Sequence, residues 1–440
     1  MKLIFDVSDK PKAGQLVVFA LQQMLAILAA TIAVPLIIGN GLTPAAAMFG
    51  AGVGTIVYIL FTKKKSPVFL GSSFAFLGSM AAAFAGGVSM QLGMLGLIVG
   101  AFLAGLVYVV IAIVVKFVGV GWLNKLMPAV VIGPTVAIIG LSLAGNAVGD
   151  LVKGDVTKQV TEYAVSTDSG TPEIIETVSN VPVGSSYVAL ICGLITLAVV
   201  MLCSTYGKKT LRLIPFIIGI LAGYAAAAIF TVIGNICDID ALKIVDFSIF
   251  SSYMLTDGSV SLKTFVSLPD FAFVSGLEGL KEFDFTYFAT IFVAYVPVAL
   301  VVFAEHVADH KNLSSIIDHD LLEEPGLTRT LLGDGVGSIA GALFGGCPNT
   351  TYGESVACVA ITGNASVVTI FAAAIGCMLF SFITPLVAFV DSIPACVMGG
   401  VCIALYGFIA VSGLKILNNY NKIAEANSVR TLLHTKNANL

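Results

Sequence analysis

Residues 347–354 read CPNTTYGE, and they open an otherwise apolar block that continues to about residue 362. Pro, Gly and several polar residues in one short run do not continue a simple helix. Extended backbone at membrane depth survives only where it lines a cavity or is buried in protein. We therefore predict that block 347–362 is a broken span, in which an extended segment precedes a short helix.

A second block begins in the same way. Residues 70–76 read LGSSFAF and open the block 67–86, which is the third apolar block, whereas 347–362 is the tenth. A repeat of seven spans reverses its direction on the second pass, so a seven-plus-seven plan would be an inverted repeat. Paired interruptions at corresponding positions indicate a transport site near the middle of the membrane. The alternative is a Gly/Ser-rich kink that serves packing alone.

Composition places these blocks in a lipid bilayer. Of the 440 residues 58% are apolar and only 11% are charged, against about 25% charged residues in an average soluble domain. The apolar blocks are about 20 residues long, the length of a membrane-spanning helix. We expect an all-α polytopic membrane protein with twelve spans, at 15–39, 44–62, 67–86, 92–118, 127–148, 187–204, 211–235, 286–308, 326–345, 347–362, 366–390 and 394–414.

Basic residues predict the orientation. Lysines gather at residues 10–12, 63–65, 116–125 and 208–209, in connections that alternate with connections of low positive charge. The positive-inside rule then places the N-terminus and the C-terminal tail in the cytoplasm. The two long loops, 149–186 and 236–285, fall outside.

The sequence lacks the motifs of an enzyme or a metal protein. It contains no nucleophile elbow, no Walker-type loop and no cluster of metal ligands. The eight cysteines form no CxxC pair and fall almost entirely in apolar blocks, so we expect small packing residues and neither a disulfide framework nor a metal site. The sequence contains neither a ring-forming selectivity-filter motif nor a voltage-sensing arginine series, so it does not indicate a channel.

Three carboxylates lie in or beside apolar blocks. Glu305 and Asp309 are four residues apart and share one helix face, and Glu354 follows the break in the tenth block. An unpaired charge within a bilayer costs several kcal/mol, so such residues are candidates for function. They could accept hydrogen bonds from a ligand and carry a proton. The alternative for Asp309, with His310, is a solvated position at the cytoplasmic helix end.

Two nearby titratable residues suggest other roles. His306 faces about 100° away from Glu305 on a helix, so we expect it to pack in the protein. Asp334 lies between two glycines near a cytoplasmic end, and we expect a structural role.

The broken blocks would add backbone donors to these carboxylates. Free N–H groups at the starts of short helices attract a partly negative oxygen. Two carboxylates and two such N–H groups suit a small planar heterocycle with alternating N–H and C=O groups, on which Phe74 or Tyr352 could stack.

Several motifs together resemble the nucleobase–ascorbate transporter (nucleobase:cation symporter 2) family, and within it the bacterial members that transport uracil. The main motifs are GSSFAF at 71–76, AEHV at 304–307 and PNTTYGE at 348–354. Further similarity lies at 29–35, 121–123, 360–362, 398–401 and 405–407, and the resemblance runs from about residue 8 to 422.

The resemblance implies a fold of fourteen segments in two inverted repeats. A core domain would comprise residues 1–118 and 286–390 (spans 1–4 and 8–11). A gate domain would comprise residues 119–285 and 391–440, with spans 5–7 and 12. Spans 13 and 14 of the family have no counterpart, because the chain stays polar after about residue 417.

The resemblance also implies roles for individual residues. Six residues would form the substrate site: Glu305, Glu354, Phe74, Gly353, Tyr352 and Ala30. The two glutamates would bind the edge of uracil, the backbone N–H groups at Phe74 and Gly353 would bind its carbonyls, and Tyr352 and Ala30 would line the pocket.

Proton coupling would fall to Glu305 or Asp309. Many relatives carry His at the position of Asp309, and His310 is one place out of register. Two further departures are Ala357, where a Gly is usual, and Gly363, where relatives carry a base.

These implications add up to a proton-coupled uracil transporter of the bacterial inner membrane, in which the core domain moves against the gate domain. The expected partners are uracil, the proton, the lipid bilayer and a second copy through the gate domain, with no nucleic acid and no cofactor. The alternatives are a xanthine or uric acid permease and a truncated member that only binds the base.

Overall fold

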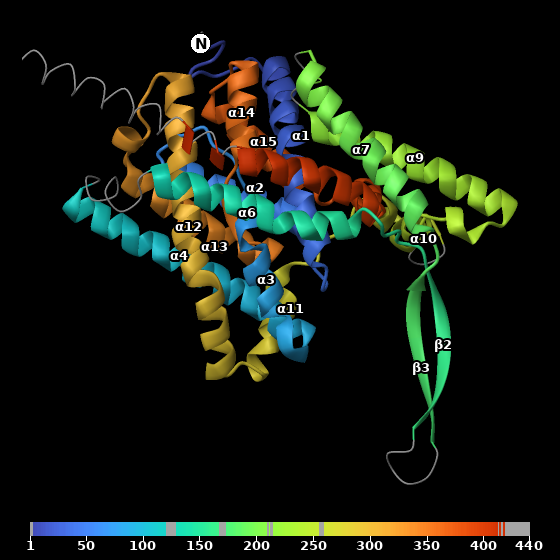
Figure 1. Ribbon diagram of the computed structural model, residues 1–440. Helices are drawn as coiled ribbons and strands as arrows, with labels where there is room; N and C mark the ends of the chain where they lie inside the picture. The colour runs from blue at the N-terminus through green and yellow to red at the C-terminus, as the bar shows by residue number, and fades with distance from the viewer. Residues whose placement is uncertain are drawn as a thin grey trace, which may run out of the picture. The chain divides into compact units, whose positions relative to one another are not determined.

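The computed structural model describes residues 3–119, 129–166, 173–208, 211, 214–254, 259–411, 413, 414, 417 and 418 (Figure 1). Six of the described helices are long and apolar enough to cross a membrane. They are α1 (Ala13–Ile38), α2 (Pro44–Phe61), α4 (Met90–Val118), α7 (Ser186–Tyr206), α9 (Pro215–Cys237) and α12 (Phe285–Ile317).

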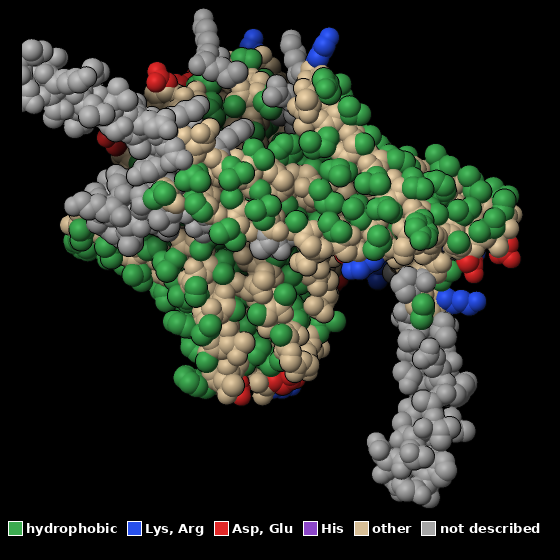
Figure 2. Space-filling view, in the orientation of Figure 1, with side chains coloured by type: hydrophobic (Ala, Val, Ile, Leu, Met, Phe, Trp, Pro, Cys, Tyr) green, Lys and Arg blue, Asp and Glu red, His purple; other side chains and the backbone are tan. Residues whose placement is uncertain are grey.

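Helix α4 exposes large apolar side chains, as a helix in contact with lipid does. Its outward side chains include Phe102, Leu106, Val110 and Phe117, of which Phe117 is 80% exposed. Figure 2 shows hydrophobic side chains spread over the visible face of the described chain, with charged side chains gathered at its margins. Water would not tolerate so much continuous apolar surface, so the exposed surface is a lipid-facing one and the protein is a multi-pass membrane protein.

The chain divides into two compact units. The first contains residues 1–143, 260–391 and 405–440, and the second contains residues 144–259 and 392–404. Helix α6 (Ala129–Asp150) belongs to both. The predicted core and gate domains have other boundaries and remain a prediction.

The first unit contains both broken spans. Strand β1 (Leu70–Ser72) precedes a single 3-10 turn and the short helix α3 (Leu77–Ala83), and strand β4 (Asn349–Thr351) precedes the short helix α14 (Gly353–Thr362). An extended segment followed by a short helix was predicted for both blocks, and both are confirmed. The sequence did not predict that β1 and β4 pair with each other, antiparallel, with Gly71 opposite Thr350.

The pairing of β1 with β4 satisfies backbone groups that lipid could not. Helix α2 makes further hydrogen bonds to the two segments. The Thr55 hydroxyl on α2 accepts from the Leu70 N–H at 2.9 Å, and the Asn349 amide donates to the Gly50 carbonyl at 3.1 Å. A Cβ on Gly341 of α13 (Leu327–Gly345) would collide with that amide, so glycine is required there.

The block predicted as one span at 366–390 is two helices, α15 (Val367–Phe380) and α16 (Thr384–Asp391). That prediction was wrong because the backbone at residues 382–384 pairs with another segment. Ser267 N–H donates to the Phe382 carbonyl at 3.0 Å, and Thr384 N–H donates to the Phe265 carbonyl at 3.1 Å. Helix Ala395–Val411 then occupies the predicted twelfth span.

The two long loops contain structure of their own. Residues 149–186 include strands β2 (Thr157–Ser166) and β3 (Glu173–Pro182), which pair antiparallel over their full length (Figure 1). Residues 236–285 include the short helices α10 (Ser248–Met254) and α11 (Ala272–Glu278). The sequence reasoning predicted none of these elements.

Candidate functional site

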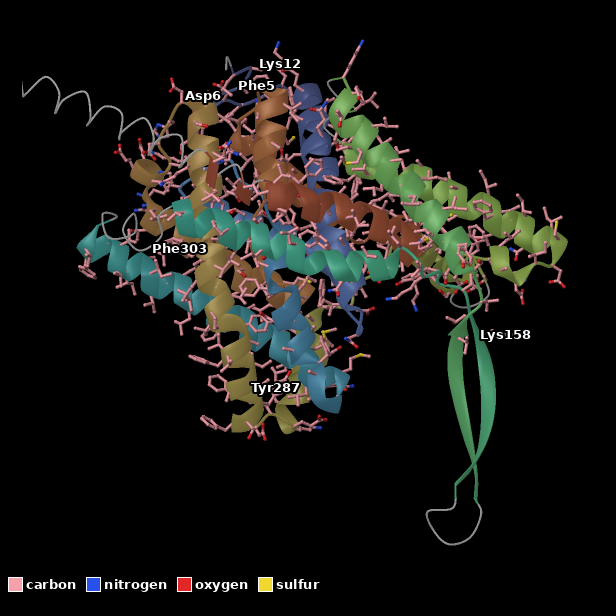
Figure 3. All side chains as sticks on the ribbon, in the orientation of Figure 1. Phe5, Asp6, Lys12, Lys158, Tyr287 and Phe303 are labelled. Atoms are coloured by element: carbon pink, nitrogen blue, oxygen red, sulfur yellow. The ribbon has the colours of Figure 1, made fainter. Side chains whose placement is uncertain are left out.

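Helix α12 carries two of the three predicted carboxylates. It begins after Asp284, whose side chain accepts from the Tyr287 N–H at 2.7 Å, and the Tyr287 hydroxyl donates to the Ala83 carbonyl at 2.7 Å. Figure 3 shows Tyr287 near the start of α12 and Phe303 further along it, two residues before Glu305. The start of α12 is thereby fixed to the end of α3.

Asp309 lies inside the protein and not at a solvated helix end. It precedes the last residue of α12 by two turns, it is half-buried, and the Thr351 hydroxyl donates to its Oδ2 at 2.8 Å. Thr351 is the last residue of β4, so this hydrogen bond joins α12 to the tenth-span break. The alternative of a solvated Asp309 was wrong.

Glu354 lies in the first turn of α14, which begins at Gly353. A Cβ built on Gly353 would lie 3.9 Å from Oδ1 of Asp309. The structure therefore brings the start of α14 next to the carboxylates of α12, as the combined site requires.

The three carboxylates act on one another. Glu305 interacts electrostatically with Asp309 and with Glu354. Within the described part of the chain, no Lys or Arg forms an ion pair with any of the three. Ionising one of these groups therefore opposes ionising the next.

The two half-helices also offer backbone donors. Phe74 and Gly353 are the first residues of their helical turns, where an N–H has no partner within the helix. In the described residues, no carbonyl or side chain accepts a hydrogen bond from either N–H. Both are free for the oxygen atoms of a ligand.

Tyr352 connects the two breaks. Its hydroxyl donates to the Ser72 carbonyl at 2.7 Å, and its ring lies so close to Gly71 that a Cβ there would overlap it. Ala30 lies buried on α1, beside Thr31, whose side chain interacts with the Tyr352 hydroxyl. The predicted pocket residues therefore gather around β1 and β4.

The sequence reasoning missed three further residues near this site. The ring of Tyr406, on helix Ala395–Val411, meets Phe74 edge to face with ring centres 5.7 Å apart. Gln23 on α1 donates to the hydroxyl of Ser355, which also accepts from the Phe69 N–H at 3.1 Å. A buried Gln within an apolar helix, and a Tyr inside the 405–407 motif, were signals that could have identified Gln23 and Tyr406.

His306 and Asp334 had been assigned separate roles, but the structure pairs them. His306 Nδ1 lies 2.6 Å from Oδ2 of Asp334, and both side chains are fully buried. The spacing of 28 residues along the chain gave no sign of this contact.

The described residues contain no group of three or more His, Cys, Asp or Glu side chains that could hold a metal ion. The eight cysteines are unpaired thiols.

Comparison with known sequences places these residues in a family. The family model described as "Permease family" matches residues 14–172 and 169–432. The "Uracil permease" of Bacillus caldolyticus is 36% identical over 418 residues, which cover 94% of this chain and 82% of that protein. The "Uracil permease" of Bacillus subtilis (strain 168) is 35% identical, covering 99% and 86%, and that of Escherichia coli (strain K12) is 33% identical, covering 94% and 83%.

Solved structures share the fold. The transmembrane domain of a cyanobacterium bicarbonate transporter, BicA, superimposes with a TM-score of 0.59 at 13% identity, covering 94% of this chain and 96% of that one. SLC26A9 superimposes with a TM-score of 0.55, also at 13% identity, covering 91% and 59%. At this identity the likeness concerns the fold alone, which is that of a membrane transporter. From the family model and the sequence relatives, the chain belongs to the permease family of nucleobase–ascorbate transporters.

Proposed function

We propose that this protein takes up uracil across the inner membrane together with protons. Relatives named uracil permease, similar over more than nine-tenths of this chain, support the substrate. The observation that carries the proposal is the junction of α12 with the start of α14, where Asp309, Glu354 and the free Gly353 N–H meet.

Uracil presents N–H and C=O groups in alternation around a flat ring. Glu305 and Glu354 would accept from its N–H groups, because carboxylate oxygens form the strong, charge-assisted kind of hydrogen bond. The free N–H groups of Phe74 and Gly353 would donate to its carbonyls. Tyr352 and Ala30, both buried beside the strand pair, would line the ring.

The carboxylates would also carry the proton. Glu305 and Asp309 share one face of α12 and lack a Lys or Arg partner among the described residues. Crossing the membrane as anions would cost several kcal/mol. A proton on Glu305 or Asp309 removes that charge, so substrate and proton would move together.

Movement would follow the family plan. A core domain (1–118 and 286–390) would move against a gate domain (119–285 and 391–440), exposing the site to each side in turn, within a fold of two inverted repeats. The basic connections support cytoplasmic termini. A homodimer would form through the gate domain.

Uptake of labelled uracil by cells without a uracil permease of their own tests this function. We expect concentrative uptake that collapses when a protonophore is added, and that unlabelled uracil, but not xanthine or uric acid, competes. If xanthine competes at equal concentration, uracil is not the preferred substrate, and the protein transports a purine. Uptake that is unchanged by the protonophore would refute the coupling to protons. Binding of uracil without uptake would refute transport.

A further inference from the structure

A second titratable pair, His306 and Asp334, takes no part in the proposed substrate contacts, although His306 directly follows Glu305 in the sequence. His306 Nδ1 lies 2.6 Å from Oδ2 of Asp334 on α13, and its Nε2 lies 3.1 Å from the Thr330 hydroxyl, also on α13. His306 and Asp334 are 1% and 0% exposed. We call these two residues the proton-sharing pair, because one proton lies between their side chains.

The hydrogen bonds fix how many protons the pair holds. The Thr330 hydroxyl lies 3.0 Å from the Leu327 carbonyl, which can only accept, so the hydroxyl donates its single proton there. The Thr330 oxygen is then an acceptor, and His306 Nε2 must carry a hydrogen. A further proton must lie between Nδ1 and Oδ2. Imidazole and carboxyl group together therefore hold two protons on three positions, which makes the pair electrically neutral.

The competing arrangement is much less favourable. If Thr330 donated to Nε2 instead, a neutral His306 would face an ionised Asp334, and the pair would carry a net negative charge. Within the described residues, His306 is the only ion-pair partner of Asp334. A lone buried charge costs several kcal/mol, so the neutral pair is the ground state.

The charge of this pair acts on the substrate site. Asp334 interacts electrostatically with both Glu305 and Asp309. The ring of His310 stacks on that of His306 with centres 4.1 Å apart, so only one of the two imidazoles can be a cation. Among the described residues, the titratable groups that face the pair from the surrounding elements are Glu305, Asp309 and His310 on α12, Tyr58 on α2 and Tyr108 on α4.

We propose that His306 and Asp334 form a second proton-binding site, linked by charge to Glu305 and Asp309. When the pair holds its shared proton it is neutral, and the α12 carboxylates ionise without its opposition. When the pair releases the proton it becomes an anion, and its charge opposes theirs. This inference rests on the proposed proton-coupled uptake and adds to it a site that sets the pH at which the coupling works.

Asp334→Asn tests the linkage, because Asn keeps the hydrogen bond to His306 but cannot hold or release the shared proton. We expect uracil binding at the optimal pH within about threefold of wild type, and a midpoint of the pH profile of uptake lowered by about one pH unit. Asp334→Glu should restore the wild-type midpoint in part. The control is Asp318→Asn, at an exposed position directly after the end of α12, for which we expect an unchanged profile.

An identical pH midpoint in wild type and Asp334→Asn would overturn the second site and leave proton-coupled uptake standing. A wild-type protein with no pH dependence at all would overturn the coupling itself. If Asp334→Asn fails to fold, infrared difference spectra of the wild-type protein with isotope-labelled histidine decide the matter. Histidine bands that change across the pH profile support the site, and unchanged bands refute it.

Discussion

At the residue scale, Glu354 is the side chain on which substrate binding should depend most. It starts a half-helix, it is half-buried, and it lies in the electrostatic neighbourhood of Glu305. Loss of a hydrogen bond to a charged group costs about 1.5–3 kcal/mol, so Glu354→Ala should weaken uracil binding roughly 10- to 100-fold. Equilibrium binding to the purified protein measures this. Glu323→Ala, at an exposed position, should bind normally, and wild-type affinity in Glu354→Ala would remove Glu354 from the site.

Gly71 offers a prediction about shape. A Cβ at this position would overlap the ring of Tyr352, whereas a Cβ at Gly78, on α3, would meet nothing within 4 Å. Gly71→Ala should displace Tyr352, lower stability by about 1–3 kcal/mol and weaken uracil binding at least tenfold. Thermal unfolding and binding in detergent, beside Gly78→Ala as the control, measure both effects. Equal behaviour of the two variants would mean that the Tyr352 ring is not fixed against β1.

At the element scale, residues 3–9 form an N-terminal strap against the segment that follows α14. Ile4 N–H donates to the Gly363 carbonyl at 2.7 Å, and Val367 N–H donates to the Val7 carbonyl at 3.1 Å. Leu3 and Val7 pack on a buried cluster that includes side chains of α12 and α14, the two helices that carry the site carboxylates. The strap therefore helps to hold these two helices together.

Val7→Asp tests the strap. A carboxylate placed against the apolar cluster should lower the free energy of unfolding by about 1–2 kcal/mol, and uracil uptake should fall with it. Ile4→Asp is the control, because Ile4 is 62% exposed. Thermal unfolding and uptake measured side by side should separate the two variants. A Val7→Asp protein as stable and active as Ile4→Asp would contradict a holding role for the strap.

Sequence reasoning recovered the elements whose signal is local. Gly and Ser within 70–76, and Pro, Gly and polar residues within 347–354, predicted the two breaks, because a short run of such residues disfavours a simple helix. The break at 381–383 was missed because its cause is distant, namely backbone pairing with residues 265–267. The β2–β3 hairpin was not predicted, because residues 149–186 were interpreted as a polar connection between spans.

For the site too, local sequence signals were predictive, and contacts between distant residues were not. Glu305 and Glu354 were singled out as candidates by their apolar surroundings in the sequence, whereas the roles of the six substrate-site residues came from the family resemblance. The structure places Phe74 just after β1 and Glu354 just after β4. The contact of Thr351 with Asp309 and that of His306 with Asp334 were not predicted, since each joins residues dozens of positions apart. A single sequence carries no record of such contacts.

At the scale of the whole molecule, stability should depend on pH through Asp155, which lies outside the membrane spans. Burial raises the pKa of this carboxyl from 3.8 to about 6, even though it accepts a hydrogen bond from the Ala395 N–H. A pKa raised in the folded state adds stability that is complete below about pH 4 and is lost as the pH rises through about 6. The midpoint of thermal unfolding should therefore fall between pH 5 and pH 8, by an amount that reflects about 1.4 kcal/mol of lost stability.

Asp155→Asn should remove most of this dependence, because Asn accepts the same hydrogen bond without ionising. It should also stabilise the protein at pH 8 relative to wild type. Thermal unfolding across the pH range measures both effects, with Asp238→Asn, at a side chain 98% exposed, as the control. A wild-type slope retained in Asp155→Asn would assign the pH dependence to other groups.

The two ends of the β2–β3 hairpin lie side by side. Thr157 lies opposite Pro182, and the Val183 N–H donates to the Val156 carbonyl at 2.9 Å. A segment of this kind is a detachable module. It can be excised and its ends joined by a short turn, or exchanged for a small folded tag, while α6 and α7 keep their spacing. With the orientation that the basic connections predict, such a tag would stand on the outer surface of the cell, where an antibody could count assembled transporters without opening the membrane.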